Sequence, residues 1–431
     1  MVQGEHGRLQ VPARRRVPRR PADDRHGQDP QAGAAVRAAT VLTGLLLLTA
    51  CGTAHHQPGL RTGQGVSDTT IELGVLSDLS GPFKAQASAR TSGYELFVAD
   101  LNAKGGVCGR KVVLRVSDHG YDVERAMAAY FELEPQVLGF LDITGAPMTA
   151  AIGPDLMQSR ALAAPASWSA ALLGNPHMMV VGTTYDLDVI NGLDHLRQEG
   201  ALREGAVIGH LHLLGDYGEN ALEGTTFFAA QSGMTVASQS ITATTNDVTA
   251  QVAALRAAKA QAVVVTTTAS QTQLAIAAAQ NWNVPFLVHV VGYDPAITDS
   301  RVLVMSSTAP LSADVPGARS AAEAFRAKYP DVRPAGPVVD GYAVGLAFTA
   351  VLDKACHTGD LTREGVLRAF HDTNDVDTLG ITAPLHFSHT GRPSSTQSYL
   401  SKPDSAASGG LTVVRPLFES PLVKLKATKA K

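Results

Sequence analysis

The sequence predicts an α/β fold with parallel sheets, arranged as two lobes. Short apolar runs such as 71–76 and 262–265 alternate with helical patterns, which is typical of parallel strands joined by crossover helices. At 431 residues the chain is too long for one ordinary hydrophobic core, which favours two domains. A hydrophobic fraction of 45% with 17% charged residues is that of a globular protein.

The best-defined unit has the order strand, loop, helix, strand. Residues 71–76 are predicted to form a buried strand, 77–92 a polar loop, 93–103 a helix and 112–116 the next strand. Such a unit places its loop at the carboxyl edge of the sheet, where open α/β sheets bind ligands. Candidate ligand contacts in this loop are Phe83 and Gln86.

An ordered series of short motifs runs through this unit. It comprises Leu79-Ser-Gly-Pro82, Gly93-Tyr-Glu-Leu96, Asp100-Leu-Asn-Ala-Lys-Gly-Gly-Val107, Gly109-Arg-Lys111 and Asp118. The series resembles the periplasmic-binding-protein type I receptors of ABC transporters, in the branched-chain amino-acid-binding branch. The segment 102–110 is its most specific piece, and a looser resemblance covers residues 71 to 400.

The resemblance implies two Rossmann-like lobes with parallel central sheets, joined by a three-strand hinge, with a solute held in the cleft between them. The boundaries expected on this basis are 1–50 for an N-terminal extension and signal peptide, 51–70 for a lipid-anchored flexible tether, 71–184 with 311–382 for lobe 1, 185–310 with 383–420 for lobe 2, and 421–431 for a tail.

The N-terminal segment carries the features of an export signal. Residues 1–35 are rich in Arg, Pro, Gln and Gly, and form either a long positive n-region or translated sequence upstream of the true start. The apolar run 41–49 is too short to span a bilayer and predicts a signal h-region. It ends in Leu48-Thr-Ala-Cys51, which resembles a bacterial lipobox and implies a lipidated Cys51. The alternative is an ordinary secretory signal with a chance cysteine.

Two strand-to-helix corners are candidate ligand sites in the first lobe. At the first, Thr144-Gly-Ala-Pro147, free N–H groups of a helix start attract an anion. The family's corresponding loop clamps the amino-acid carboxylate, so the resemblance assigns this role to Thr144, Gly145 and Thr149.

The second corner follows a short strand and supplies two hydroxyls and an apolar wall, from Ser167, Ser169 and Trp168. The alternative for both corners is simple helix capping. The family's usual Ser-Ser-Ser/Thr run is replaced at residues 144–148, and Trp168 stands where a small residue is common. Both departures bear on specificity for leucine-class solutes.

The second lobe is expected to close over the solute. Asp216-Tyr217-Gly218 matches a loop that supplies a tyrosine to the ligand in the family, and Thr268 lies where another pocket side chain is expected. Tyr293 and Asp294 lie where the family places an acidic group near the ligand's ammonium. Asp294 could equally be a turn or helix-cap residue.

Cys108 and Cys356 remain once Cys51 is assigned to lipid. An exported location permits a disulfide, and the family fold places both segments in the first lobe. The resemblance therefore implies a Cys108–Cys356 bond, and the alternative is two unpaired buried thiols.

No cofactor, metal or enzymatic activity is expected. The histidine pairs 55–56 and 210/212 have no evident third ligand. Nucleophile-elbow, phosphate-loop, zinc-protease and dinucleotide-binding motifs are absent from the sequence. A net charge of -3 and 5% aromatic residues give no nucleic-acid-binding footprint.

The function expected by resemblance is that of an extracytoplasmic solute-binding lipoprotein of an ABC importer. It would be a monomer, anchored to the outer face of the cell membrane only through its lipid. It would bind an amino acid, branched-chain or a related amide, and deliver it to a membrane permease. A ligand-sensing receptor without transport and an exported α/β enzyme are the alternatives.

Overall fold

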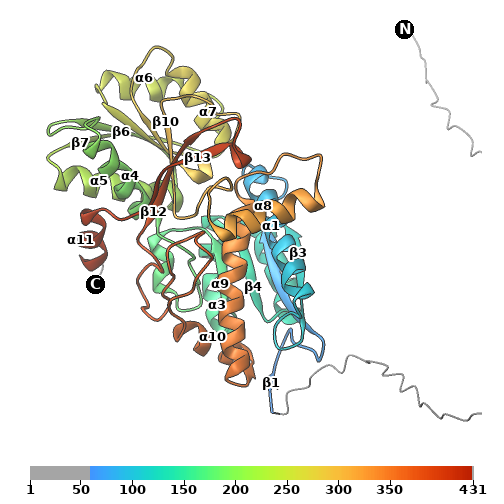
Figure 1. The fold of residues 1–431 in the computed structure, drawn as a ribbon. Helices are drawn as coiled ribbons and strands as arrows, with labels where there is room; N and C mark the ends of the chain where they lie inside the picture. Colours follow the sequence, from blue (N-terminus) through green and yellow to red (C-terminus); the bar gives the residue numbers. More distant parts are fainter. Residues whose placement is uncertain (1–58, 430–431) are drawn as a thin grey trace, which may run out of the picture. The chain divides into compact units, whose positions relative to one another are not determined.

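The computed structural model describes residues 59–429, and their side chains through residue 427. These residues build two main sheets with helices packed on them, and a third sheet of only two short strands (Figure 1). The expected signal peptide, the start of the expected tether and Cys51 lie outside the described residues. None of the described helices has the length and apolar character needed to cross a membrane.

The first sheet is parallel, with the strand order β3-β2-β4-β5. Its strands are β2 (Thr70–Ser77), β3 (Lys111–Asp118), β4 (Gly139–Thr144) and β5 (Ala163–Ala166). Its helices are α1 (Lys84–Ala103), α2 (Val123–Leu133), α3 (Ala146–Ser159), α8 (Pro316–Lys328), α9 (Val338–His357) and α10 (Arg363–His371).

Alternate side chains of β2 enter two separate cores, because successive residues of a strand point to opposite faces. Ile71, Leu73 and Val75 pack with apolar residues of α1, α8, α9 and α10. Leu76 faces the other way and packs with residues of α2 and α3. The predicted strand–helix–strand unit is therefore present and is covered on both faces.

The second sheet has the order β13-β12-β10-β9-β8-β6-β7. Its parallel strands are β6 (Val207–Leu213), β7 (Thr235–Ile241), β8 (Ala262–Thr266), β9 (Phe286–His289) and β10 (Val302–Ser306). The antiparallel strands β12 (Ser398–Pro403) and β13 (Leu411–Phe418) extend it at one edge. Its helices are α4 (Tyr185–Gln198), α5 (Asp216–Gln231), α6 (Thr249–Ala257), α7 (Ala269–Ala278) and α11 (Pro421–Lys429).

The chain passes between the two sheets three times. The crossings are residues 167–184 between β5 and α4, 307–315 between β10 and α8, and 372–397 between α10 and β12. Mixed α/β architecture with parallel sheets was the predicted fold class and is confirmed.

Three local predictions were wrong. Helix α1 starts at Lys84, so the predicted loop over 77–92 is too long. The pattern was missed because two positions on the buried side of this turn of helix, Gln86 and Arg90, are polar. Part of the expected tether is ordered, because β1 (Arg61–Thr62) pairs with β11 (Asp360–Leu361). Part of the expected tail forms α11, whose Val423 is fully buried.

Helices α1 and α9 lie side by side although they are far apart in sequence (Figure 1). Glycines on both helices allow this close approach. A Cβ on Gly93 would lie 2.3 Å from the carbonyl oxygen of Val338, and one on Gly341 would lie 2.5 Å from that of Arg90. The glycine pair thus sets the position of the α1 turn that carries Arg90.

We expect Gly341→Ala to lower the free energy of unfolding by about 1–3 kcal/mol, because the added methyl group forces the two backbones apart. Gly153→Ala is the matched control, since Gly153 is also a buried helical glycine but its Cβ would meet its neighbours at 3.4 Å or more. The control should leave stability unchanged or raise it by up to about 1 kcal/mol. Urea unfolding of both variants measures the difference, and equal stabilities would contradict the proposed role of the glycine.

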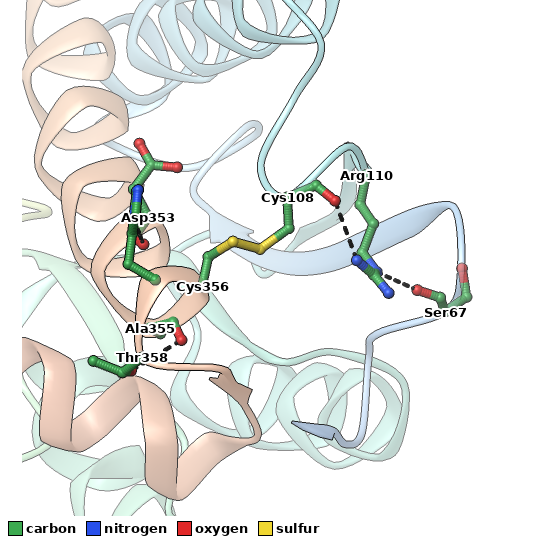
Figure 2. The surroundings of a disulfide bond; sticks show 8 residues. Ser67, Cys108, Arg110, Asp353, Ala355, Cys356 and Thr358 are labelled. Atoms are coloured by element: carbon green, nitrogen blue, oxygen red, sulfur yellow. Dashed lines mark hydrogen bonds between the residues drawn. A yellow bond between two sulfur atoms is a disulfide. The ribbon is translucent and has the colours of Figure 1, made fainter. Parts of the chain in front are cut away.

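A disulfide joins Cys108, in the turn between α1 and β3, to Cys356 near the end of α9 (Figure 2). The two Cα atoms are 6.0 Å apart. Arg110 holds the turn by donating hydrogen bonds to the carbonyl oxygens of Cys108, at 3.2 Å, and Ser67, at 2.7 Å. The bond therefore links the turn that follows α1 to α9, the helix that the glycines bring against α1.

Candidate functional site

A cavity lies at the carboxyl ends of the first sheet's strands, where elements of the second sheet face them. Its space of about 420 Å³ includes some volume open to solvent. The first sheet, together with its helices and connecting loops, contributes Phe83, Gln86, Arg90, Tyr121, Thr144, Gly145, Ala146, Ala166 and Trp168. The second contributes Tyr185, Tyr217 and Val291. Size and position are those of a small-molecule site in an α/β protein.

Aromatic rings form most of the cavity wall. Phe83 and Tyr121 have ring centroids 4.8 Å apart on one side, and Tyr185 and Tyr217 lie 4.7 Å apart on the other. Trp168 meets Tyr185 edge to face at 6.2 Å. Burial raises the pKa of Tyr185 to about 12 and that of Tyr217 well above its usual value, so both hydroxyls stay neutral. The wall therefore favours an apolar group.

Arg90 is the cationic side chain among the described residues that line this cavity. Its side chain is only 7% exposed. Its guanidinium lies 5.9 Å from the ring centroid of Trp168, and Nη2 donates a 3.4 Å hydrogen bond to Thr144 Oγ1. Its Nε has no hydrogen-bond partner in residues 59–427 and lies 3.7 Å from Asp142 Oδ2. A buried donor with spare capacity thus lines the cavity.

The guanidinium remains charged in this environment. Burial acts to lower the pKa of Arg90, but Asp142, and then Tyr94, Asp340 and Tyr185, outweigh burial and raise the pKa above its usual value. A buried, permanent cation whose Nε makes no hydrogen bond within residues 59–427 can accept an anionic ligand.

The start of α3 reinforces this preference. Its N-cap, Gly145, has a φ of 99° and no side chain that could cap the helix. A Cβ at Gly145 would come within 2.8 Å of the ring of Tyr121, so only glycine fits the corner. First-turn amides of a helix carry partial positive charge and remain available to an anion. Arg90 and the start of α3 meet at Thr144, which lines the cavity between them.

Hydrogen bonds between the two sides surround the cavity. Gln86 Nε2 donates to the carbonyl oxygen of Tyr293 at 3.2 Å, and Ser169 Oγ donates to Asp216 Oδ1 at 2.7 Å. These two bonds bring the lobes into contact beside the site. Within the second lobe, Tyr217 Oη lies 3.5 Å from His289 Nδ1, and the opposite ring nitrogen of His289 lies 3.4 Å from Asp188 Oδ2.

Six residues named from the sequence line the cavity: Phe83, Gln86, Thr144, Gly145, Trp168 and Tyr217. The six others do not line it. Thr149 donates to the carbonyl oxygen of Gly145 at 2.8 Å, Ser167 is fully buried, and Ser169 bonds to Asp216. Thr268 caps α7 together with Gln271.

Tyr293 and Asp294 belong to a neighbouring hollow, which is reached past Gln86. The hydroxyl of Tyr293 donates to the carbonyl oxygen of Gly410 at 2.6 Å. Asp294 accepts a 2.8 Å hydrogen bond from the amide of Ala296, the turn-capping role that the sequence left open.

Sequence reasoning missed three side chains that dominate the cavity: Arg90, Tyr121 and Tyr185. Arg90 lies one helical turn after the named Gln86, but the sequence pattern predicts a loop for this stretch. Tyr121 follows the carboxyl end of β3 and Tyr185 begins α4, directly after the first crossing. Both tyrosines could have been predicted from their positions, because residues at strand ends and crossings face the ligand-binding edge of an α/β sheet.

The histidine pair on β6 is hydrogen-bonded internally. His210 Nε2 lies 2.9 Å from Thr266 Oγ1, His210 Nδ1 lies 2.9 Å from Thr225 Oγ1, and His212 Nδ1 lies 3.1 Å from its neighbour's carbonyl oxygen. No group of three or more metal-ligating side chains occurs in the part of the chain that the structure describes.

Comparison with known proteins agrees with this architecture. A family model described as periplasmic binding protein matches residues 70–408. The structure of a fatty acid ABC transporter substrate-binding protein from Thermomonospora curvata is 35% identical, with a TM-score of 0.81, over 85% of this chain and 96% of that one. No curated protein sequence matches the chain.

More distant structures share the fold. A branched-chain amino acid ABC transporter protein from Thermus thermophilus with bound valine aligns with a TM-score of 0.74 at 17% identity, covering 85% of this chain and 100% of that one. A leucine-binding protein from Thermotoga maritima aligns with a TM-score of 0.67 at 15% identity, covering 80% and 98%. With its two main sheets, three crossings and a cavity at the strand ends, the chain belongs to the periplasmic binding protein family, as a type I member related to the substrate-binding proteins of ABC transporters.

Proposed function

We propose that this protein is the extracytoplasmic solute-binding component of an ABC importer, and that its solute is a small apolar carboxylic acid. The observation that carries the proposal is Arg90, a buried cation at the edge of an aromatic cavity, whose Nε makes no hydrogen bond within residues 59–427. The solute's carboxylate binds Arg90 and the first-turn amides of α3, and its hydrocarbon part packs against the aromatic rings.

The same cavity disfavours the amino acid expected from the sequence. An amino acid carries an ammonium group, and a buried charge of this kind is best matched by a carboxylate. None of the side chains in residues 59–427 that line the cavity is a carboxylate. Asp294, expected to meet the ammonium, lies in the neighbouring hollow and caps a turn.

One relative supports the same choice of solute. The relative that is 35% identical is named for fatty acids. The valine- and leucine-binding proteins, at 17% and 15% identity, support the fold only. Straight-chain carboxylates are therefore the first solutes to test, and branched-chain amino acids are the second candidates.

Closure of the lobes, docking on a permease and membrane anchoring complete the proposed function. Residues 71–184 with 311–382, and 185–310 with 383–420, act as two lobes that close on the solute, and the closed form docks on a membrane permease without chemical change to the solute. Lipid on Cys51 holds the monomer at the outer face of the membrane. Support for export comes from the h-region and lipobox of the sequence.

Thermal unfolding with added ligands tests the solute class. Hexanoate, octanoate and decanoate are compared with octanamide, 1-octanol, valine, leucine and leucinamide, because ligand binding to the folded state stabilises it by about 2.7 kcal/mol at 100 times the dissociation constant. We expect the carboxylates to raise the unfolding temperature more than the uncharged chains, and the amino acids to leave it unchanged. Stabilisation by leucine but not by octanoate would overturn the proposed solute.

A further inference from the structure

Two buried carboxylates lie near one buried cation beside the cavity, before any solute binds. Asp142 on β4 is fully buried, accepts a 3.0 Å hydrogen bond from Thr144 Oγ1, and lies against Arg90. Asp340 on α9 is also buried and accepts a 2.7 Å hydrogen bond from Thr308 Oγ1. Both carboxylates act electrostatically on the single guanidinium of Arg90.

A solute carboxylate bound to Arg90 would add a third negative charge to the cluster formed by Arg90, Asp142 and Asp340. Buried carboxylates that share one cation cannot all stay ionised, because their repulsion is weakly screened and each has lost its water. One of them must bind a proton when the solute enters.

We infer that the site binds its carboxylate together with one proton, and that Asp142 is the residue that receives this proton. The inference rests on the proposed function, since it requires an anionic solute at Arg90. The proton comes from water or buffer and returns there when the solute leaves.

Three observations favour Asp142 as the acceptor. It is the carboxylate that forms the ion pair with Arg90, so the solute competes with it directly. Its Oδ1 has no hydrogen-bond partner within residues 59–427, so that atom is free to carry a proton. Burial raises the pKa of Asp142 to about 6, although Arg90 and Thr144 pull it down.

The other titratable groups near Arg90 are less suited to this role. Tyr94 on α1 and Tyr185 on α4 are already neutral, because burial raises the pKa of both. Burial also raises the pKa of Asp340, but its ionised form keeps the hydrogen bond from Thr308 and has His289 nearby. His289 is itself placed against Asp188.

The direction of the pH dependence follows from the proton uptake. Above about pH 6 the free protein has Asp142 ionised, so binding must take up a proton and the dissociation constant should rise by up to tenfold per pH unit. Below that pH Asp142 already carries the proton, and affinity should level off. Release of the solute is therefore favoured by alkaline conditions.

Calorimetric titration with octanoate at pH 7.5, in phosphate, HEPES and Tris, counts the protons. These buffers differ in ionisation enthalpy, so the slope of binding heat against that enthalpy gives the number of protons taken up. We expect a slope approaching one for the wild type and near zero for Asp142→Asn, whose amide oxygen can still accept from Thr144. Asp340→Asn is the matched control and should keep the wild-type slope.

Each outcome is informative. Binding of octanoate by the wild type with zero slope, or an unchanged slope in Asp142→Asn, would overturn the inference and leave the proposed function standing. Absence of any octanoate binding would overturn both. If Asp142→Asn fails to fold, the wild-type dissociation constant between pH 6 and 8.5 decides: a constant value overturns the inference, and a rise of tenfold or more supports it.

Discussion

Arg90→Met is expected to weaken octanoate binding at least about 100-fold. Truncating one partner of a buried charge pair costs 2–5 kcal/mol, and about 2.7 kcal/mol corresponds to a factor of 100 in the dissociation constant. Methionine fills much of the volume of the arginine stem, so the aromatic wall keeps its packing while the cation is lost. Titration calorimetry or intrinsic fluorescence of the aromatic wall measures the change.

Two controls separate lost charge from lost structure. Arg90→Met leaves Asp142 buried beside a neutral side chain, so the double variant Arg90→Met/Asp142→Asn removes that unpaired carboxylate. We expect the double variant to regain stability but not octanoate affinity. Octanamide, which carries no charge, should bind the wild type and both variants within about tenfold of one another.

Arg90→Lys tests the geometry of the cation. Lysine keeps the charge but cannot present two parallel N–H groups to a carboxylate, so its affinity should fall between those of the wild type and Arg90→Met. Octanoate binding by Arg90→Met with wild-type affinity would show that the carboxylate lies elsewhere in the cavity, and the anchoring role of Arg90 would be wrong.

Removal of the disulfide is expected to cost about 2–5 kcal/mol of the free energy of unfolding. The bond joins residues separated by 248 positions, so it restricts a very long loop in the unfolded chain. The double variant Cys108→Ser/Cys356→Ser, compared with the wild type by guanidinium unfolding, measures this effect. Reducing agent should lower the stability of the wild type and leave the double variant unchanged.

Solute binding should survive removal of the bond. Cys356 lies 16 residues after Asp340 on α9, which corresponds to about 24 Å along a helix. The bond therefore holds the far ends of α1 and α9 together, and the glycine contact near Arg90 remains. Equal stability of the two proteins without reductant would contradict a stabilising role, and loss of octanoate affinity alone would show coupling to the cavity.

The sequence predicted the part of the cavity that is tied to strand ends. Gly145 and Thr144 were found because a strand meets a helix start there, and Trp168 because the next corner lies at the same edge. Tyr217 was found through a motif in the second lobe. Local pattern located the two corners at the strand ends, and the family resemblance supplied the ligand role of Thr144 and Gly145 and the choice of Tyr217.

The cation at the site escaped this reasoning. Arg90 and Gln86 occupy buried positions of α1 where the helical pattern calls for apolar residues, so the amphipathic signal disappears in the turn that carries the function. Thr268 and Asp294, in contrast, were predicted to contact the ligand but do not line the cavity. Both have hydrogen-bonding side chains at turns near the cavity, but each satisfies local backbone groups instead of lining it.

The sequence alone determined the alternation of strands and helices, the two-lobed α/β fold and the edge of the sheets at which a ligand binds, because hydrophobic periodicity and short connections are local properties of the chain. The tertiary structure decided which charges meet. Arg90, Asp142 and Asp340 come from α1, β4 and α9, and their proximity depends on a close crossing of two helices that lie far apart in sequence. Burial then makes their interaction strong, because water no longer screens it.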